Sequence, residues 1–337
     1  MFTVPQSPAV PGKGTVEPLD LIIIMPVYED QESASILIKN LAAECPNPPY
    51  IIAVEDGSVR NPLPISAISD AGLSGEVIYL ARNMGHQRAI AAGVAYVAAN
   101  LNAKAIVIMD SDGEDQPQSI PPLLEELSKG SNDAVVAERR KRSETLGFRT
   151  FYIVYRFFFK MMTGRVIRFG NFTALSMRSI KRLAAMQELW VHVAASLMVS
   201  RLRVGKVATD RGKRYAGRSQ MNFVSLALHG LRSIMVFAED VLVRVGLFCV
   251  VLAAISIALL GLSVTLKTVG FATPGWFSIA VGILLLILMQ AGVLTFVTLM
   301  ISGLIRSAPP VTRTELEALI DRVERTPVRV PVSALGS

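Results

Sequence analysis

Cysteine is scarce: the chain has only 2 in 337 residues, which excludes a small secreted fold stapled by disulfides. Cys249 lies inside a long apolar segment, whereas Cys45 lies in a more polar part of the chain. We therefore expect no bond between them, and the composition fits a reducing compartment.

Two common nucleotide-binding signatures are also absent. No Gly-x-Gly-x-x-Gly follows the first predicted strand, which excludes the dinucleotide-binding fingerprint, and no Walker A lysine motif occurs. The N-terminal region has prolines but no apolar core. We expect a flexible tail over residues 1–19 rather than a signal peptide.

Charged residues are missing from two long stretches near the C-terminus. Residues 245–266 hold none over 22 positions, and residues 268–305 hold none over 38. Because about 20 apolar residues can cross a bilayer core, the sequence predicts two transmembrane helices, at about 245–266 and 276–304. The rest of the chain is too small to enclose such a hairpin as a soluble core.

The basic residues that flank these stretches predict their orientation. Arg232 and Arg244 precede the first, Arg306 and Arg313 follow the second, and the link between them carries only Lys267. The positive-inside rule then places both termini and the soluble domain in the cytoplasm. The net charge of +7 collects beside these segments, so its expected partner is anionic lipid and not nucleic acid.

Between residues 20 and 137 the sequence alternates between two kinds of segment. Apolar runs favour buried strands, at 21–25, 51–54, 76–80, 103–108 and 133–137, and helical patterns separate them, at 33–43, 86–100 and 119–128. This alternation predicts an α/β fold with a mostly parallel sheet and helices on both faces. In such sheets the ligand lies beyond the carboxyl ends of the strands.

Polar clusters follow these strands, and the densest is the stretch from Asp110 to Asp115, which packs four carboxylates into six residues. Residues i and i+2 of an extended strand end point the same way, so Asp110 and Asp112 are expected to face one point. Two carboxylates suit Mg²⁺ or Mn²⁺, which take their other ligands from substrate phosphates and water. The alternative interpretation is a solvated acidic turn.

Two later stretches are basic. The aromatic segment 148–162, which includes Arg149, Arg156 and Lys160, fits a core helix or, as we favour, a helix in the membrane interface. Residues 201–218 hold seven bases and one acid, so this stretch is either a solvated loop or a cradle for phosphate.

Two helices are expected around the spans. Residues 219–243 favour an amphipathic helix that leads into the first span, and residues 314–325 favour a short helix in the tail. The apolar face of the short helix, with Leu316, Leu319, Ile320 and Val323, needs a partner. That partner is either another subunit or the domain itself, so a homo-oligomer stays open.

The order of four motifs resembles family 2 glycosyltransferases of the GT-A fold. The motifs are Met25-Pro26-Val27-Tyr28-Glu29-Asp30, Val54-Glu55-Asp56-Gly57-Ser58, Arg82-Asn83-Met84-Gly85-His86-Gln87 and Met109-Asp110-Ser111-Asp112. Arg214-Tyr215-Ala216-Gly217-Arg218-Ser219 and the two spans resemble those of membrane-bound polyprenyl-phosphate glycosyltransferases, akin to dolichol-phosphate mannose synthase. The resemblance covers about residues 20–305; each motif alone is common, but their order is specific.

The resemblance implies a GT-A, Rossmann-like catalytic domain over 20–218, with interfacial helices within 148–200. A juxtamembrane helix over 219–243, two transmembrane helices within 244–305 and a cytoplasmic tail over 306–337 follow. The implied activity is inverting transfer of a sugar from a UDP- or GDP-sugar to a membrane polyprenyl phosphate, dependent on Mg²⁺ or Mn²⁺.

The resemblance also implies roles for single residues. Those expected to bind the nucleotide-sugar are Pro26, Tyr28, Asp30, Glu55, Asp56, Ser58, Arg82, Asn83, His86 and Ser111. Asp110, Asp112 and Glu114 would bind the metal, and Arg211, Lys213, Arg214, Arg218 and Ser219 would bind the acceptor phosphate. Asp110, Asp112 and Arg214 are the expected catalytic residues, and His86 either contacts the diphosphate or caps a helix.

Two positions depart from the family pattern, both on the acceptor side. Asn171 stands where several relatives carry an aspartate considered as a base, and Gln220 stands where relatives often have lysine. An acceptor phosphate is already ionised at neutral pH and needs little help from a base. A neutral glycolipid hydroxyl as acceptor, or a non-catalytic nucleotide-sugar-binding membrane protein, are the alternatives.

Overall fold

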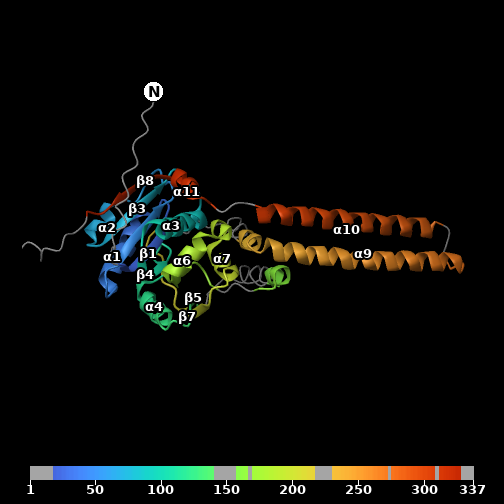
Figure 1. The fold of residues 1–337 in the computed structure, drawn as a ribbon, viewed down its shortest axis with the longest axis horizontal. Coiled ribbons are helices and arrows are strands. Elements are labelled where there is room, and N and C mark those ends of the chain that lie inside the picture. Colours follow the sequence, from blue (N-terminus) through green and yellow to red (C-terminus); the bar gives the residue numbers. More distant parts are fainter. Residues whose placement is uncertain are drawn as a thin grey trace, which may run out of the picture.

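The computed structural model describes residues 18–139, 157–165, 169–216, 230–271, 275–307 and 311–327. It has two parts, an α/β domain and a pair of long helices that extend side by side from one end of that domain (Figure 1).

The domain is built on one eight-stranded sheet in the order β7-β5-β6-β4-β1-β2-β3-β8. The strands are β1 (Leu19–Val27), β2 (Tyr50–Glu55), β3 (Ser74–Leu80), β4 (Ala103–Ile108), β5 (Ala134–Arg139), β6 (Thr173–Leu175), β7 (Val204–Thr209) and β8 (Ile320–Arg325). The central strands β4, β1, β2 and β3 are mutually parallel, and β6 and β8 run antiparallel to their neighbours. The predicted α/β architecture with a mostly parallel sheet is confirmed.

Helices cover both faces of the sheet because successive strand residues point to opposite sides. Ile22 and Ile24 pack under α3 (His86–Asn100), α6 (Met177–Ala184) and α7 (Val193–Val199). Ile23 and Met25 pack under α1 (Gln31–Glu44), α2 (Ser66–Asp70) and α4 (Ile120–Ser128). Both faces of β1 are therefore buried, as its unbroken apolar run predicts.

The helix predicted over residues 314–325 is wrong in its second half. Helix α11 covers only Arg313–Leu319, and the chain then continues as β8, which pairs antiparallel with β3. Without β8, β3 would be an edge strand with unpaired backbone groups. Pairing satisfies these groups and lets Ile320 and Val323 pack against the core, so the partner of this apolar face is the domain itself.

Strands β6 and β7 were not expected from the sequence. Residues 204–209, part of the stretch interpreted as a basic loop, form β7 and pair parallel with β5. β6 has only three residues, too few to show a period, and lies between β4 and β5. Both strands depend on partners that are distant along the chain, so local pattern is a weak guide to them.

A buried polar cluster ties β8 to the core. Glu76 is only 3% exposed and accepts hydrogen bonds from Tyr50 Oη at 3.0 Å and Tyr96 Oη at 2.6 Å. Arg325 Nε lies 3.3 Å from Glu76 Oε2, and Arg325 Nη2 donates to Tyr96 Oη at 3.1 Å. The guanidinium therefore supplies the charge that balances a buried carboxylate.

Replacing Arg325 by glutamine should lower the free energy of unfolding by roughly 1–2 kcal/mol, because Glu76 would stay buried without its cation. The loss should be smaller than for a fully buried pair, since the Arg325 side chain is 56% exposed. Denaturant titration of the detergent-solubilised chain measures it. Arg60→Gln is the control, because that side chain is 84% exposed and lies 3.9 Å from Glu29; an equal loss there would contradict the prediction.

A second ion pair joins β7 to the start of β5 and predicts a dependence on pH. Arg203 donates to Asp133 through Nε at 3.0 Å, Nη2 at 2.9 Å and its backbone N–H at 3.0 Å. These bonds lower the pKa of Asp133 from 3.8 to about 2. Because folding lowers the pKa of Asp133, its ionised carboxylate stabilises the fold fully at pH values above the ordinary pKa of 3.8. This stabilisation is lost as the pH falls through about 2.

In the parent chain, the midpoint of denaturation should fall as the pH is lowered from the ordinary pKa of Asp133 to its lowered value. We expect a smaller fall over this pH range in Arg203→Gln, because that variant lacks the bonds that lower the pKa. Denaturant midpoints measured at several acidic pH values test this. Arg182→Gln changes another exposed arginine, one that makes no hydrogen bond to Asp133, and should follow the parent curve. Parallel curves for all three proteins would disprove the linkage.

The two long helices are α9 (Ala238–Thr268) and α10 (Trp276–Ser307). Both are long and apolar enough to cross a membrane. Only 11% of the most apolar 18-residue stretch of α9, and 6% of that of α10, is buried within the structure. Core helices of a soluble protein would be mostly buried, so these are candidate membrane spans, as predicted. Cys249 is buried in α9 and Cys45 is buried in the α/β domain, and both are free thiols.

A short helical segment at 157–163 packs between the start of α9 and the α/β domain. The rings of Phe159 and Phe237 meet edge to face with centroids 5.6 Å apart, and the Arg165 guanidinium lies 5.3 Å from the Phe237 centroid. Phe157 and Met161 point outward, 69% and 51% exposed. The remainder of the predicted interfacial helix, 148–156, and residues 219–229 of the juxtamembrane helix lie outside the described residues.

Candidate active site

The acidic turn after β4 is held by its own side chains. Met109 N donates to Ile24 O at 3.1 Å and extends the ladder, after which Asp115 Oδ2 accepts from Asp110 N at 3.1 Å. Asp112 Oδ1 accepts from Glu114 N at 3.0 Å. Asp115 is 4% exposed, so this carboxylate, which the sequence analysis gave no role, shapes the turn from inside.

A basic loop lies directly over this turn. Gly212 N donates to Glu114 O at 2.9 Å and Tyr215 N donates to Asp112 O at 3.0 Å. The approach is close enough to require glycine, since a Cβ on Gly212 would come within 2.5 Å of Gly113 O. Gly113 has a φ of +87° and lies against the Tyr215 ring, where a Cβ would clash at 2.3 Å.

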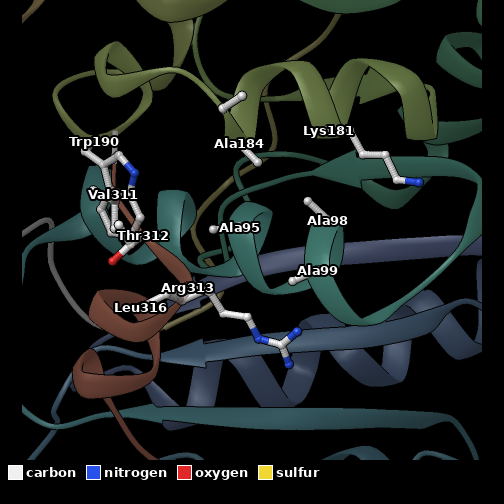
Figure 2. Close-up of a pocket in the computed structure, with 11 residues that line it drawn as sticks. Ala95, Ala98, Ala99, Lys181, Ala184, Trp190, Val311, Thr312, Arg313 and Leu316 are labelled. Carbon is white, nitrogen blue, oxygen red and sulfur yellow. The ribbon is translucent and has the colours of Figure 1, made fainter. Parts of the chain in front are cut away.

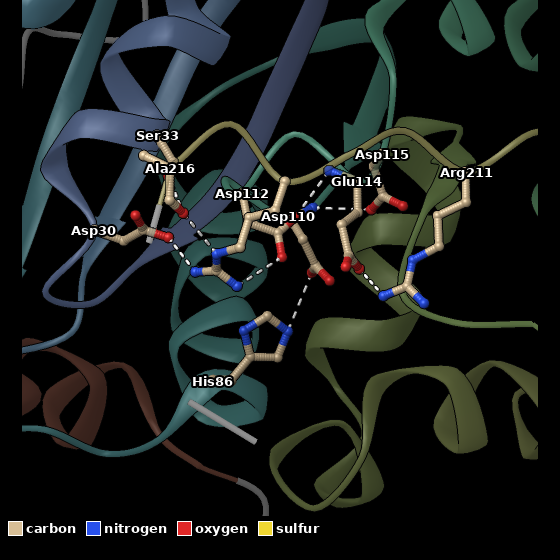
Figure 3. Close-up of polar contacts among 10 residues, drawn as sticks. Asp30, Ser33, His86, Asp110, Asp112, Glu114, Asp115, Arg211 and Ala216 are labelled. Atoms are coloured by element: carbon tan, nitrogen blue, oxygen red, sulfur yellow. Dashed lines mark hydrogen bonds and ion pairs between the residues drawn. The ribbon is translucent and has the colours of Figure 1, made fainter. Parts of the chain in front are cut away.

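The arginines of this loop pair with the acidic side chains (Figure 3). Arg214 Nη2 lies 2.5 Å from Asp30 Oδ2, and Arg214 Nη1 lies 3.2 Å from Asp112 Oδ2. Arg211 makes an ion pair with Glu114. The structure therefore brings together Asp30, Asp112 and Arg214, which the sequence analysis assigned separately to donor, metal and acceptor.

The carboxylate pair has the electrostatics of a cation site. Burial raises the pKa of Asp112 above its ordinary value, the Asp110 charge raises it further, and Arg214 and Arg211 oppose both. Within the described residues, no group of three or more His, Cys, Asp or Glu side chains is placed to hold a metal. Asp110 and Asp112 fit Mg²⁺ or Mn²⁺, which bind through one or two carboxylates and take further oxygens from phosphates. Glu114, the third predicted ligand, faces Arg211 instead.

His86 and Asn171 border the same turn. His86 Nε2 lies 3.1 Å from Asp110 Oδ1 and 3.1 Å from Asn171 Nδ2. Burial would lower the pKa of His86, but the charge of Asp110 and its hydrogen bond outweigh burial and raise it. Gln87 fixes Asn171, since its Nε2 donates to Asn171 Oδ1 at 3.3 Å while its Oε1 accepts from Val193 N at 2.7 Å. Nothing in the sequence pattern indicated this role for Gln87.

Glu55 and Asp56 face inward and hold the neighbouring loops. Glu55 accepts from Leu63 N at 2.7 Å and from Ser58 through its backbone N–H and hydroxyl. Asp56 accepts from Met84 N at 2.7 Å and Gly85 N at 2.9 Å. Both carboxylates are 1% exposed, and burial raises both pKa values. In this arrangement their oxygens position the loops, and the predicted contact with a nucleotide base stays a prediction.

Glu29 has a comparable role that the sequence analysis did not assign. It has a φ of 49° and accepts from the backbone N–H groups of Val59, Arg60 and Asn61 at 2.9–3.2 Å. These bonds lower its pKa. Its place within the motif Met25 to Asp30, at the end of the first strand, was the only available signal.

The remaining predicted residues lie along the same edge of the sheet, because the carboxyl ends of parallel strands meet there. Pro26 is the penultimate residue of β1 and pairs with Val54, Tyr28 beyond the strand is 49% exposed, and Ser111 is buried in the turn. Arg82, Asn83 and Lys213 are exposed. Arg218, Ser219 and Gln220 lie outside the described residues.

A mostly parallel sheet with an acidic turn and a facing basic loop at its carboxyl edge is the arrangement expected of a GT-A-type domain. Residues 22–187 match the family described as Glycosyl transferase family 2. The chain therefore carries a domain of glycosyltransferase family 2, as its motifs predicted.

Three curated relatives illustrate the similarity. The dodecaprenyl-phosphate galacturonate synthase of Rhizobium johnstonii is 29% identical over 43% of this chain and 44% of its own length. The undecaprenyl-phosphate 4-deoxy-4-formamido-L-arabinose transferase of Yersinia enterocolitica is 32% identical over 42% of this chain and 44% of its own length. An uncharacterized glycosyltransferase of Synechocystis is 26% identical over 80% of this chain and 85% of its own length. The matched part thus spans less than half of the first two relatives.

Among solved structures, glucosyl-3-phosphoglycerate synthase from Mycobacterium tuberculosis, crystallised with Mn²⁺ and UDP-glucose, is similar with a TM-score of 0.50 and 15% identity. The similarity covers 66% of this chain and 79% of that chain. At this identity it supports the fold of the domain.

Proposed function

We propose that this protein is an inverting glycosyltransferase that moves a sugar from a UDP- or GDP-sugar to a membrane polyprenyl phosphate at the cytoplasmic face. The observation that carries the proposal is the convergence of Asp30, Asp112 and Arg214 at the carboxyl edge of the sheet. One place thus offers carboxylates for a divalent cation and a guanidinium for a phosphate. Two relatives whose names specify polyprenyl-phosphate sugar transfer support this choice of acceptor.

The donor would lie along the strand-end motifs from Tyr28 to Asp112. Asp110 and Asp112 would hold Mg²⁺ or Mn²⁺, which would neutralise charge on the departing nucleoside diphosphate. His86, which lies beside Asp110, would contact the diphosphate.

The acceptor would be bound from the basic side of the site. Arg214 would exchange its carboxylate partners for the acceptor phosphate, with Arg211 and Lys213 nearby. Asn171 has no role as a base because an amide does not take up a proton at neutral pH. This suits a phosphate acceptor, which is already ionised, better than a neutral hydroxyl.

The candidate spans would keep the lipid acceptor close to the site. Both ends of the α9–α10 hairpin connect to the same α/β domain (Figure 1). Arg232 and Arg244 precede the uncharged stretch of α9, and Arg306 and Arg313 follow that of α10, so the positive-inside rule supports a cytoplasmic domain.

The purified full-length chain, reconstituted with undecaprenyl phosphate and Mn²⁺, should transfer label from one member of a panel of UDP- and GDP-sugars to the lipid fraction. The product should have the opposite anomeric configuration to the donor, as read by NMR. Label recovered only in a neutral glycolipid would support the hydroxyl acceptor instead. Tight donor binding without any labelled product would support a non-catalytic binding protein.

A further inference from the structure

A hollow in the α/β domain lies away from the acidic turn, between α3, α6, η2 (Gln187–Trp190) and the segment that starts at Val311 (Figure 2). It has a volume of about 290 Å³. Three small side chains on one face of α3 line it, Ala95, Ala98 and Ala99. Its α3 residues follow His86 by 9 to 13 positions, which is roughly 14–20 Å of helix, so it is separate from the candidate active site.

The two ends of this hollow differ in chemistry (Figure 2). Trp190 and Val311 lie together at one end, whereas the side chains of Lys181 and Arg313 extend toward the other. Among the described residues that line it there is no acidic side chain. Such a surface suits a ligand that is both apolar and anionic, since the alanines and Trp190 exclude water while the cations attract a negative charge.

Both cations have capacity for an anionic partner. Lys181 is exposed, and no carboxylate lies within ion-pair distance of it in the described part of the chain. The ion pair of Arg313 with Glu317, at 2.9 Å, uses only Nε. Its two Nη groups can then donate elsewhere. Helix α6 adds Arg178 and Arg182 to its exposed face and carries no acid.

The position of the hollow identifies the source of the ligand. Val311 follows Ser307, the last residue of α10, by four positions, so it lies within about 14 Å of the end of a candidate span. The headgroup layer begins where a span leaves the hydrocarbon core. Tryptophan and basic side chains are enriched at that level.

We propose that this hollow binds the headgroup of an anionic phospholipid from the adjacent leaflet. The phosphate lies against Lys181 and Arg313, and the glycerol and first acyl carbons lie over the alanines toward Trp190. The inference rests on the proposed function only in that α9 and α10 lie in a bilayer. It assigns a lipid site to a surface that the transfer reaction does not use.

Trp190 provides a direct test because the chain has only 2 tryptophans, and Trp276→Phe leaves Trp190 as the single tryptophan, which can be excited selectively over tyrosine. The full-length Trp276→Phe chain is reconstituted in phosphatidylcholine nanodiscs that contain phosphatidylglycerol with a nitroxide near the headgroup. Quenching of Trp190 is expected to half-saturate at a lower mole fraction than with equally labelled phosphatidylcholine. Lys181→Gln should raise the half-saturating fraction of phosphatidylglycerol about fivefold, the effect of one cation at an anionic surface.

Two further variants separate a site from general surface charge. Arg182→Gln removes a cation from the same helix outside the hollow and should leave the half-saturating fraction unchanged. Ala98→Leu keeps every charge but fills the hollow, and should abolish the preference for phosphatidylglycerol while the denaturation midpoint is retained.

Equal quenching by the two labelled lipids would overturn the proposal, as would equal effects of Lys181→Gln and Arg182→Gln. Displacement of labelled phosphatidylglycerol by inorganic phosphate at equal concentration would show a site for soluble phosphate instead, and would also overturn it. Failure of the chain to enter nanodiscs would count against the proposed membrane spans rather than the transfer activity, and would remove the basis for a lipid ligand.

Discussion

Replacing Asp112 by asparagine is expected to reduce sugar transfer by about a thousandfold or more. The substitution removes one of the two carboxylates that would hold the divalent cation, and stabilisation of the leaving group through that cation is worth several kcal/mol. The asparagine oxygen can still accept from Glu114 N, which Asp112 Oδ1 does at 3.0 Å, so the turn should keep its shape. Release of labelled lipid measures transfer, and electron paramagnetic resonance measures Mn²⁺ binding.

Asp70→Asn is the matched control, because Asp70 is an exposed carboxylate at the end of α2 and far along the chain from the acidic turn. It should retain full transfer and unchanged Mn²⁺ binding. Undiminished turnover in Asp112→Asn, with an unchanged denaturation midpoint, would refute the assignment of this carboxylate.

Arg214→Gln is expected to have opposite effects on transfer and on binding of the metal alone. Transfer should fall about a hundredfold, since the acceptor phosphate loses a guanidinium that acts in the desolvated site. Without substrates, Mn²⁺ should bind about tenfold more tightly to the variant. In the parent chain Arg214 Nη1 pairs with Asp112 Oδ2 at 3.2 Å, and the guanidinium charge repels the metal ion; the variant lacks both effects. The same two assays report both effects.

Lys213→Gln is the control for the metal measurement. Lys213 adjoins Arg214 and carries the same charge, but it is exposed, and no carboxylate lies within ion-pair distance of it in the described ranges. Its substitution should change Mn²⁺ affinity only slightly, since exposed charges are screened. Equal affinities in the parent chain and Arg214→Gln would mean that Arg214 does not hold Asp112 in solution.

The predicted and observed site differ most clearly at Glu55 and Asp56. Their place after a buried strand correctly located them at the carboxyl edge, because period and strand direction are local properties. Their orientation depends on which backbone N–H groups lie nearby after folding, and here Leu63, Met84 and Gly85 supply them. A motif therefore marked the place of these side chains but not the direction in which they point.

The tail shows the same limit for secondary structure. Spacing of the apolar residues Leu316, Leu319, Ile320 and Val323 fits a helical face, and the helix does form as far as Leu319. Beyond it, the unpaired edge of β3 stabilises an extended strand more than continued helix, since backbone pairing and side-chain packing are gained together. The local sequence pattern of the tail cannot indicate this pairing, because the edge of β3 is about 245 residues away in the chain.

By itself the sequence determined the features that arise from local period and composition. These are the alternation of strands and helices, the polar motifs at strand ends, the two uncharged spans and the closeness of Asp110 to Asp112. Only the tertiary structure decided that Arg214, 102 residues beyond Asp112, lies on that carboxylate, and that β8 returns from the hairpin to complete the sheet. Such contacts join residues that are far apart in the chain, so each requires a long loop to close. Which side chains then pair is determined by the packing of the folded domain and not by neighbouring residues in the sequence.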